Sequence, residues 1–578
     1  MDCEAQIYSD EYADLILDFG VDKEVLLEND PTLCIYEIDE DIHIVHKRRE
    51  EGEVFSRSEF RYLFLPNAYG IMENAVGDTE RAGTGSYLTV MEQAGIAPVW
   101  RPPLSLTGLG TCVAIIDTGI DYNNPAFIRD DGTSRILAIW DQTDETGTPP
   151  EGFWYGSFYT RENINEALAS RNPFDIVPVR DITGRHGTAV ASIAAGRIKS
   201  ENGGDSYRGA AYEADIIVVK LKQIKDYLRT YYCIPDGVPC YGENDILTAL
   251  KFVSSFLVPL QRPVSVCLGI GSSFGPHEGK SILSRYIQKL SYKRNLCISV
   301  TGGNEGNEEH HFRDAFREGE GESRTVEIRV GEGVDGFFMQ FWGTLPNRFT
   351  LSVRSPGGER VSGINSSLER TTEFSFIYDD TRLTVDVLPV EPLSGQELVV
   401  FRFVAPTPGI WQINVVPNLV YYPAFYDFWL PITAFMSGEV TFTEPNPYIT
   451  LTAPSMAQDC ICVAPYVGDT GGLYPAAGRG YTRIGTVKPD IAAPGVNIPT
   501  PVGVRSGGSM AAAIVCGAAA LYQEWAVVQE RDPLINGVGL RKRLIRGAER
   551  LLGGIYPNRE NGYGFLDLEG VFRNLAER

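Results

Sequence analysis

The segment that most constrains the fold of this chain runs from Arg505 to Leu521. Ser509 lies among small residues, and an apolar, alanine-rich run from Ile514 to Leu521 follows it. This pattern predicts a buried helix with a serine in its first turn, where backbone N–H groups are unpaired and the helix dipole favours negative charge. Such a position suits the stabilisation of an oxyanion. A Gly-rich turn that leads into a core helix would have the same sequence pattern. This segment alone therefore does not distinguish a catalytic serine from a structural turn.

Length and charge limit the classes of protein that the chain can belong to. With 578 residues, it is longer than one hydrophobic core usually spans, and we expect several domains. Its net charge of −24 argues against nucleic acid or an anionic membrane as the main partner. The polar N-terminus shows no basic region followed by an apolar one, so we expect no signal peptide and synthesis in the cytoplasm. No apolar run is long enough to predict a membrane span.

The cysteines are scattered along the chain. Cys112, Cys267, Cys297 and Cys462 lie in apolar, strand-like runs and are predicted to be buried thiols. Two others, Cys233 and Cys240, flank a turn-rich segment and could pair, although nothing in the sequence indicates an oxidising compartment.

The first part of the chain reads as a small α+β module. Strand-like runs occur at residues 13–19, 34–36, 42–45 and 62–65, separated by polar and turn-forming residues. The Gly-rich segment from Asn67 to Ser86 that follows is expected to be an exposed connection.

From Leu106 onward the pattern changes twice. Apolar strands alternate with helices, which predicts a doubly wound α/β domain around a parallel sheet. Between residues 320 and 447 the apolar residues alternate at period two, which predicts an antiparallel sandwich or jelly roll inserted into the α/β domain. The α/β pattern resumes at Cys460 and leads to the serine helix.

Three further residues lie where side chains perform chemistry. Asp117 ends an apolar strand, His186 begins a small-residue helix, and Asn304 lies on a Gly-rich loop after a strand. Each has an ordinary structural interpretation as a turn, cap or core residue. Asp117-Thr118-Gly119, with a second such triplet at 469–471, also matches aspartic proteases, but the α/β pattern disagrees with their all-β fold.

Taken together, these residues carry a resemblance to a known family. The chain order Asp117, His186, Ser509 is that of the subtilisin triad. The chain resembles the subtilases, the subtilisin-like serine proteases, in four blocks: residues 115–121, 186–191, 303–306 and 507–512. A finer resemblance, to the clostridial Csp germination proteases, extends over nearly the whole chain in stretches such as 131–136, 140–143, 159–165, 207–211, 478–483 and 561–564.

The resemblance implies a role for each residue. Ser509 would be the nucleophile, His186 the general base and then acid, and Asp117 the residue that orients His186. Asn304 would donate its side-chain amide to the oxyanion. The expected reaction is peptide hydrolysis through an acyl-enzyme.

The resemblance also implies a domain organisation. Residues 1–86 would be a prodomain that acts as an intramolecular chaperone, 87–319 and 448–578 the two parts of the catalytic domain, and 320–447 the jelly-roll insertion. Self-cleavage is expected between Asn67 and Leu88, with the end of the prodomain remaining in the substrate cleft.

The implied biological task is the activation of a spore cortex-lytic enzyme precursor during germination, by a protease kept in the spore. The alternative is a catalytically weak or inactive scaffold with the same fold that acts in germinant signalling. Gly508 replaces the usual Thr and Ala513 the usual Pro, and these two departures keep that alternative open. Arg185 and Ser192 also stand where Gly is usual.

No metal is expected from the sequence. His310 and His311 are adjacent on a polar loop, where histidines are more often solvated than ligating. Asp130 and Asp131 could contribute to a calcium site, as in some subtilases, but they lack EF-hand spacing and a turn is the simpler interpretation.

Overall fold

A nine-stranded, mostly parallel sheet forms the centre of the molecule. The computed structural model describes residues 3–18, 23–49, 63–73, 86–319 and 322–576. The strand order is β28-β27-β15-β13-β6-β11-β7-β8, with β29 paired to β27, and only the edge strands β8 and β28 run antiparallel to their neighbours. The strands are β6 (Cys112–Asp117), β7 (Ile136–Asp141), β8 (Ser157–Thr160), β11 (Asp215–Lys220), β13 (Val264–Leu268), β15 (Leu296–Thr301), β27 (Ile461–Val467), β28 (Gly472–Leu473) and β29 (Ile491–Pro494).

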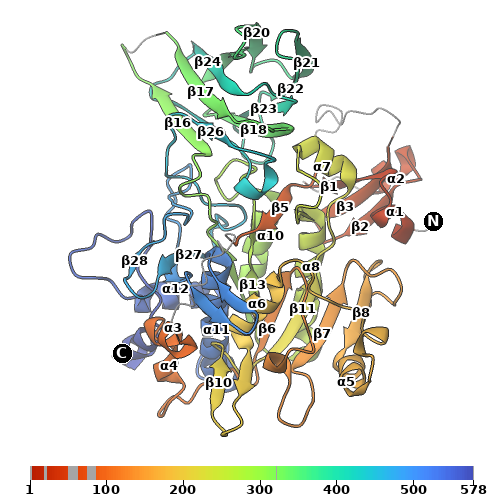
Figure 1. The fold of residues 1–578 in the computed structure, drawn as a ribbon, viewed down its shortest axis with the longest axis vertical. Helices are drawn as coiled ribbons and strands as arrows, with labels where there is room; N and C mark the ends of the chain where they lie inside the picture. The colour runs from red at the N-terminus through yellow and green to blue at the C-terminus, as the bar shows by residue number, and fades with distance from the viewer. Residues whose placement is uncertain (1–2, 19–22, 50–62, 74–85, 320–321, 577–578) are drawn as a thin grey trace.

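Helices cover both faces of this sheet (Figure 1). On β6, Val113 and Ile115 face the cluster that holds α6 (His186–Ala195) and α11 (Gly508–Gln523). Ala114 and Ile116 face the opposite cluster, with α8 (Glu243–Ser255) and α10 (Ile282–Ser291). This confirms the doubly wound α/β prediction, because strands covered on both faces are apolar on both. The four cysteines predicted to be buried thiols are buried.

Other helices and short strands complete the α/β domain. They are α3 (Tyr87–Gln93), α4 (Ile96–Val99), α5 (Arg161–Ala169), α7 (Asp226–Tyr232), α9 (Leu257–Leu260), α12 (Gly537–Gly547), α13 (Leu568–Ala576), β9 (Arg197–Lys199), β10 (Asp205–Arg208), β30 (Ile498–Thr500) and β31 (Gly503–Arg505).

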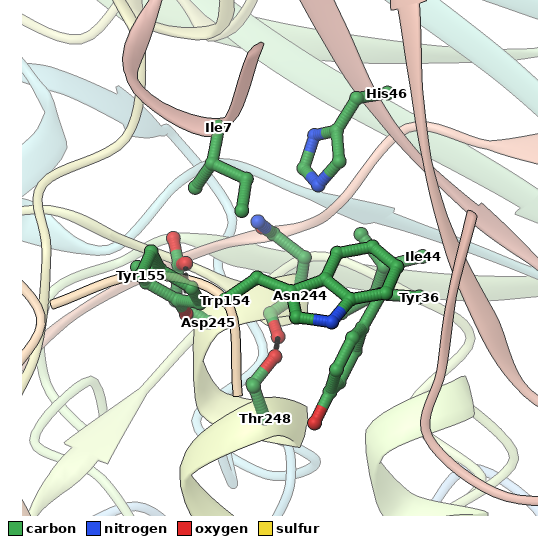
Figure 2. Close-up of a pocket in the computed structure, with 9 residues that line it drawn as sticks. All are labelled: Ile7, Tyr36, Ile44, His46, Trp154, Tyr155, Asn244, Asp245 and Thr248. Carbon is green, nitrogen blue, oxygen red and sulfur yellow. Dashed lines mark hydrogen bonds between the residues drawn. The ribbon is translucent and has the colours of Figure 1, made fainter. Parts of the chain in front are cut away.

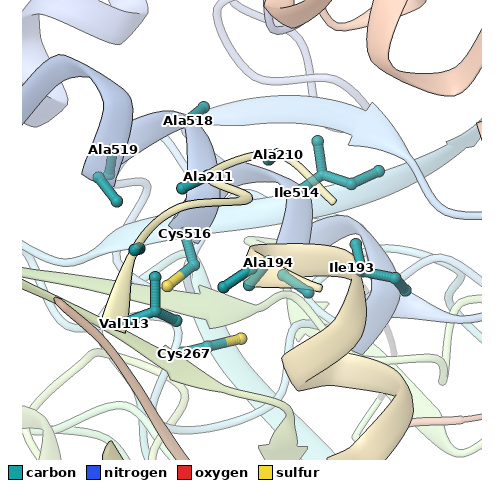
Figure 3. Close-up of a cluster of buried hydrophobic side chains, with 14 of the residues drawn as sticks. Val113, Ile193, Ala194, Ala210, Ala211, Cys267, Ile514, Cys516, Ala518 and Ala519 are labelled. Carbon is teal, nitrogen blue, oxygen red and sulfur yellow. The ribbon is translucent and has the colours of Figure 1, made fainter. Parts of the chain in front are cut away.

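Small residues let α11 pack closely against its neighbours (Figure 3). A side chain at Gly517 would overlap Ala210 and the backbone of Ala194. Together with the π-helical turn Glu524–Val528 that continues it, α11 is long and apolar enough to cross a membrane, contrary to the sequence prediction, yet 83% of that stretch is buried inside the domain. Burial against the sheet accounts for its apolar composition.

The N-terminal module is a four-stranded antiparallel sheet with two helices. Its elements are α1 (Cys3–Tyr8), β1 (Tyr12–Leu17), α2 (Lys23–Asn29), β2 (Cys34–Glu37), β3 (His43–Arg48) and β4 (Leu63–Phe64), in the strand order β2-β3-β1-β4. The four predicted strands are present; where those predictions reach Phe19 and Tyr62, they lie outside the described residues.

The one disulfide among the described residues joins Cys3 to Cys34 and ties α1 to the start of β2. Cys233 and Cys240, which could have paired, are both free thiols. Cys233 instead lies against the carbonyl of Phe403, and burial raises its pKa to about 11.

The segment after the module is not the exposed connection predicted from its glycines. Residues 68–71 form β5 (Ala68–Ile71), which lies between β12 (Tyr241–Gly242) and β14 (Ile270–Gly271) and pairs antiparallel with both. Tyr69 and Met72 are buried. The two strand edges satisfy the backbone groups of this segment, which therefore stays ordered without a periodic sequence pattern. The rest of the predicted connection, residues 74–85, lies outside the described residues.

The insertion consists of two antiparallel sheets around their own core, as predicted. The strand orders are β16-β25-β18-β23-β22-β21 and β20-β19-β24-β17-β26, and alternate residues of both sheets fill one apolar cluster. The first strand of the insertion, β16, lies before the expected boundary at residue 320. It belongs to the insertion because it pairs with β25. The strands are β16 (His311–Phe316), β17 (Arg324–Val330), β18 (Gly336–Gly343), β19 (Arg348–Arg354), β20 (Arg360–Asn365), β21 (Arg370–Phe376), β22 (Thr381–Leu388), β23 (Glu397–Val404), β24 (Gly409–Leu419), β25 (Ala424–Trp429) and β26 (Val440–Phe442).

The adjacent histidines at the start of the insertion are buried rather than solvated, so that part of the sequence interpretation is wrong. His310 Nδ1 lies 2.8 Å from a carboxylate oxygen of Glu305. His311 lies 3.1 Å from Asp427 and stacks on Trp429. The partners come from distant or loop positions, which a local sequence pattern does not reveal.

A buried carboxylate in the insertion predicts a pH-dependent stability. Burial raises the pKa of Glu397 to about 7, although the charge of Arg348, 3.7 Å away, opposes the shift. The folded protein therefore holds the Glu397 proton more tightly than the unfolded chain, whose carboxyl has the ordinary pKa of 4.5. This contribution to stability is fully present below pH 4.5 and is lost as the pH rises through 7. Glu397→Gln should therefore raise Tm at pH 8, by the equivalent of about 3 kcal/mol, and have little effect at pH 4.5. Thermal unfolding of both proteins at the two pH values checks this, and an equal effect at both would contradict it.

Candidate active site

Asp117, His186 and Ser509 meet at the carboxyl end of the central sheet. Asp117 is the last residue of β6, His186 the first of α6, and Ser509 lies in the first turn of α11. His186 Nδ1 is 2.7 Å from Asp117 Oδ1, and His186 Nε2 is 2.9 Å from Ser509 Oγ. This is the hydrogen-bonded chain of a serine protease triad.

The triad is buried, and its charges set the basicity of the histidine. All three side chains are almost inaccessible to solvent. Burial alone would lower the pKa of His186, but the charge and hydrogen bond of Asp117, with further help from Glu73 and Asp181, raise it above its ordinary value of 6.5. His186 is therefore a stronger base than a free histidine.

The raised pKa of His186 predicts the pH dependence of catalysis. The general base must be neutral to accept the serine proton, so activity falls as the pH drops below the pKa of His186. The acid limb of the pH–rate profile should have its midpoint above 6.5, and Glu73→Gln should lower that midpoint because it removes one of the raising charges. Rates of peptide-bond cleavage measured across pH 5–9 check both points. A midpoint below 6.5 would contradict the geometry of the Asp117–His186 pair.

Asp181 and Gly269 support the triad and were missed by the sequence analysis. Asp181 accepts hydrogen bonds from Thr118 Oγ1 and from the backbone and side chain of Thr188, which joins the loop after β6 to α6. A Cβ on Gly269 would lie 3.0 Å from Ser509 Cβ and 3.1 Å from His186 Cε1. An aspartate before a helix and a glycine after a strand are common in sequences, so neither pattern would have identified Asp181 or Gly269 as part of the site.

Asn304 lies beside the serine with its amide nitrogen available. Its Oδ1 accepts a hydrogen bond from the Gly508 backbone at 2.9 Å. Its Nδ2 is buried and has no hydrogen-bond partner within the part of the chain that the structure describes. An unpaired buried donor next to a nucleophile is typical of an oxyanion hole.

The chain's own residues occupy the cleft in front of the serine. The backbone N–H of Met72 donates to the carbonyl of Gly269 at 3.1 Å. The Met72 carbonyl oxygen lies 2.8 Å from Ser509 Oγ and 3.4 Å from the Ser509 backbone nitrogen. A Cβ on Gly507 would lie 2.7 Å from that carbonyl and 3.1 Å from Asn304 Nδ2, so the carbonyl and the amide face the same small space.

The departures from the family pattern have local explanations. A Cβ at Gly508 would overlap Thr301 Oγ1, so a threonine has no room there. Arg185 has a left-handed backbone with φ of 58°, the conformation in which glycine is usual, and pairs with Asp121 at 3.3 Å. Ser192 donates to the carbonyl of Ala189 within α6. The structure gives no separate reason for Ala513.

The remaining candidates do not join this site. Asp469 is exposed on the turn between β27 and β28, so the aspartic protease interpretation is wrong. Asp131 caps its turn through Thr133, as the turn interpretation predicted, and Asp130 pairs with Lys199. Within the described ranges, no group of three or more His, Cys, Asp or Glu side chains is placed to hold a metal ion.

Comparisons with known proteins agree with this geometry. The family model described as the Subtilase family matches residues 108–231 and 418–564. The fold and triad define a serine protease, and the chain belongs to the subtilase family. Its structure is similar to that of the CspB protease of Clostridium perfringens, with 30% sequence identity, a TM-score of 0.73, and coverage of 85% of this chain and 99% of that one.

More distant similarity extends to fervidolysin from Fervidobacterium pennivorans, a keratinolytic enzyme related to subtilisin. The identity is 13% and the TM-score 0.49, over 97% of this chain and 61% of that one. A comparison with curated proteins found no match.

Proposed function

We propose that this chain is a self-processing serine endopeptidase that cleaves its own Met72–Glu73 bond. The observation that carries the proposal is the position of the Met72 carbonyl, 2.8 Å from Ser509 Oγ. The backbone pairing of β5 on both sides holds the segment extended, as a protease holds a substrate.

The residues perform the steps of acyl transfer. His186 Nε2 accepts the Ser509 proton as Ser509 Oγ attacks the Met72 carbonyl carbon. The Ser509 backbone N–H and Asn304 Nδ2 stabilise the resulting oxyanion. The C–N bond to Glu73 breaks as His186 protonates the leaving amine, and water, activated by His186, then releases Met72 as a carboxylate.

After cleavage, the N-terminal module remains bound through contacts that hydrolysis does not touch. Lys225 Nζ lies 2.7 Å from Asp14 Oδ1 and donates to the carbonyls of Gln6 and Tyr12. Asp14 also accepts from His46 at 2.7 Å. Burial alone would raise the pKa of Asp14, but Lys225 and His46 hold it well below its usual range, so this buried charge stays paired.

Figure 2 shows the apolar side of the same interface. The N-terminal module and the α/β domain both line a small cavity, so their side chains meet across it. Its lining residues are Ile7, Tyr36, Ile44 and His46 from the module, and Trp154, Tyr155, Asn244, Asp245 and Thr248 from the α/β domain. Cleavage at residue 72 would leave these contacts intact.

The experiment that tests self-processing is the intact mass of the purified protein with N-terminal sequencing of any fragments. We expect two fragments that co-elute on size exclusion, the larger beginning at Glu73. A chain that stays whole, or that is cut elsewhere in 67–88, would overturn the assignment of the bond.

The wider role that we propose is activation of a cortex-lytic enzyme precursor during spore germination, by an enzyme made in the sporulating cell and kept in the spore. The support is the resemblance to the Csp branch and the similarity to CspB. Antibody detection in spore and vegetative fractions tests the location, and incubation of the purified protease with the precursor tests the substrate. The scaffold alternative depended on Gly508 and Ala513. Thr301 supplies a steric reason for the first, and no observation favours the alternative.

A further inference from the structure

Arg505 contacts the residue that follows the proposed scissile bond. Its guanidinium nitrogen Nη1 lies 2.9 Å from Glu73 Oε1. The two side chains are 18% and 12% exposed, so the pair is largely shielded from water. A charge-assisted hydrogen bond is stronger in such a buried position than at the surface.

The arginine is held in place independently of Glu73. Its Nη2 donates to the Gly184 carbonyl at 2.7 Å and also lies 3.4 Å from the Val502 carbonyl. Gly184 precedes the histidine helix, and Arg505 ends β31 just before the serine turn. The positive charge is therefore part of the cleft and is presented to whatever residue follows the bond that is cut.

On the other side of the bond, the insertion narrows the cleft. Gly70 lies two residues before Met72, and a Cβ there would lie 2.5 Å from Ile432 Cδ1 and 3.0 Å from Phe435 Cε1. Both side chains are buried and lie in the segment between β25 and β26, which connects the two sheets of the insertion. A residue larger than glycine would have to displace them.

We propose that the cleft selects extended peptides with an acidic residue directly after the scissile bond and glycine two residues before the residue that is acylated. Arg505 binds the acidic side chain, and Ile432 and Phe435 sterically exclude residues larger than glycine. The proposal rests on cleavage at Met72–Glu73 and extends it to the class of protein substrate that the enzyme takes in trans.

The chemistry gives the expected order of preference. Glutamate or aspartate after the bond pairs with Arg505, whereas a neutral residue leaves the guanidinium only its backbone partners. Lysine or arginine would bring two positive charges together in a partly buried site, which is the most unfavourable case.

A charge-reversal experiment in the full-length chain tests the acidic preference. Rates of self-cleavage are measured by intact mass for wild type, Glu73→Lys, Arg505→Glu and the double variant. Each single variant should be slower by at least about tenfold, as expected when one partner of a buried charge pair is replaced, and the double variant should recover most of the loss. The control is Glu73→Lys combined with Arg171→Glu, an exposed arginine after α5, which should give no recovery.

The outcomes separate this inference from the function on which it rests. If wild type is not cut at Met72–Glu73, the proposed self-cleavage fails and the inference fails with it. If wild type is cut there, but the single variants process at the wild-type rate or the double variant recovers nothing, only the inference fails. Recovery in the double variant also shows that the single variants were slow for reasons other than misfolding.

A second pair of variants tests the glycine preference. Gly70→Ala should slow self-cleavage by about tenfold, and Ile432→Ala added to it should restore the rate because it removes the obstructing methyl group. Equal rates for wild type and Gly70→Ala would overturn this part. Thermal unfolding of the same variants in a Ser509→Ala background shows whether the fold is kept.

Discussion

Ser509→Ala should yield a chain that stays whole and has no measurable peptidase activity. Removal of the nucleophile leaves His186 without a proton to transfer and the Met72 carbonyl without an attacking atom, so the rate should fall by at least about 10⁴-fold. Intact mass beside wild type measures the effect, and the loss of one hydroxyl at a packed position should leave Tm within a few degrees of wild type.

The matched control for this variant is Ser506→Ala, which removes a hydroxyl from the same segment. Ser506 Oγ accepts a hydrogen bond from the Asn497 backbone and makes no contact with the triad that the structure records. Ser506→Ala should process normally. Processing in Ser509→Ala at the wild-type rate would mean that another nucleophile, or a contaminating protease, cuts the chain.

Gly508→Thr restores the residue that is usual in the family, and it should nevertheless slow self-cleavage about 100-fold. The added side chain would overlap Thr301 Oγ1 on β15 and push the turn away from His186 and Asn304. A displacement of about 1 Å in a catalytic geometry costs about 100-fold in rate. Self-cleavage followed by mass over hours measures the loss.

The steric cause can be tested by making room. Thr301→Ala removes the overlapping oxygen, together with the hydrogen bond that it accepts from the Gly303 backbone. Added to Gly508→Thr, it should restore a large part of the rate, whereas Thr301→Ala alone should have a small effect. If the double variant folds but stays inactive, the overlap with Thr301 is not the reason for glycine at position 508.

The sequence allowed the triad to be predicted because its residues lie in local motifs. Each of Asp117, His186 and Ser509 ends a strand or begins a helix in a run of small or apolar residues, and the order along the chain indicates the arrangement. The α/β domain and the antiparallel insertion could also be predicted, because the period of the apolar residues indicates which faces of each element are buried.

What the sequence did not reveal depends on distant partners. β5 is buried because residues 241–242 and 270–271 offer it two strand edges, and nothing within residues 68–71 predicts that. His311 is buried with a polar partner, Asp427, which lies far along the chain and orients its ring. The contact between Arg505 and Glu73 joins residues 432 positions apart. Composition and spacing carry no information about such pairs.

The pairing of β5 has a consequence for the colloidal behaviour of the enzyme. Without β5, β12 and β14 would each lose the backbone partners that it provides, next to the apolar surface that Tyr69 and Met72 cover. Open strand edges of this kind template the association of other chains. β5 therefore covers two strand edges at which chains could associate, and we expect its removal to favour association unless another extended chain pairs with β12 and β14.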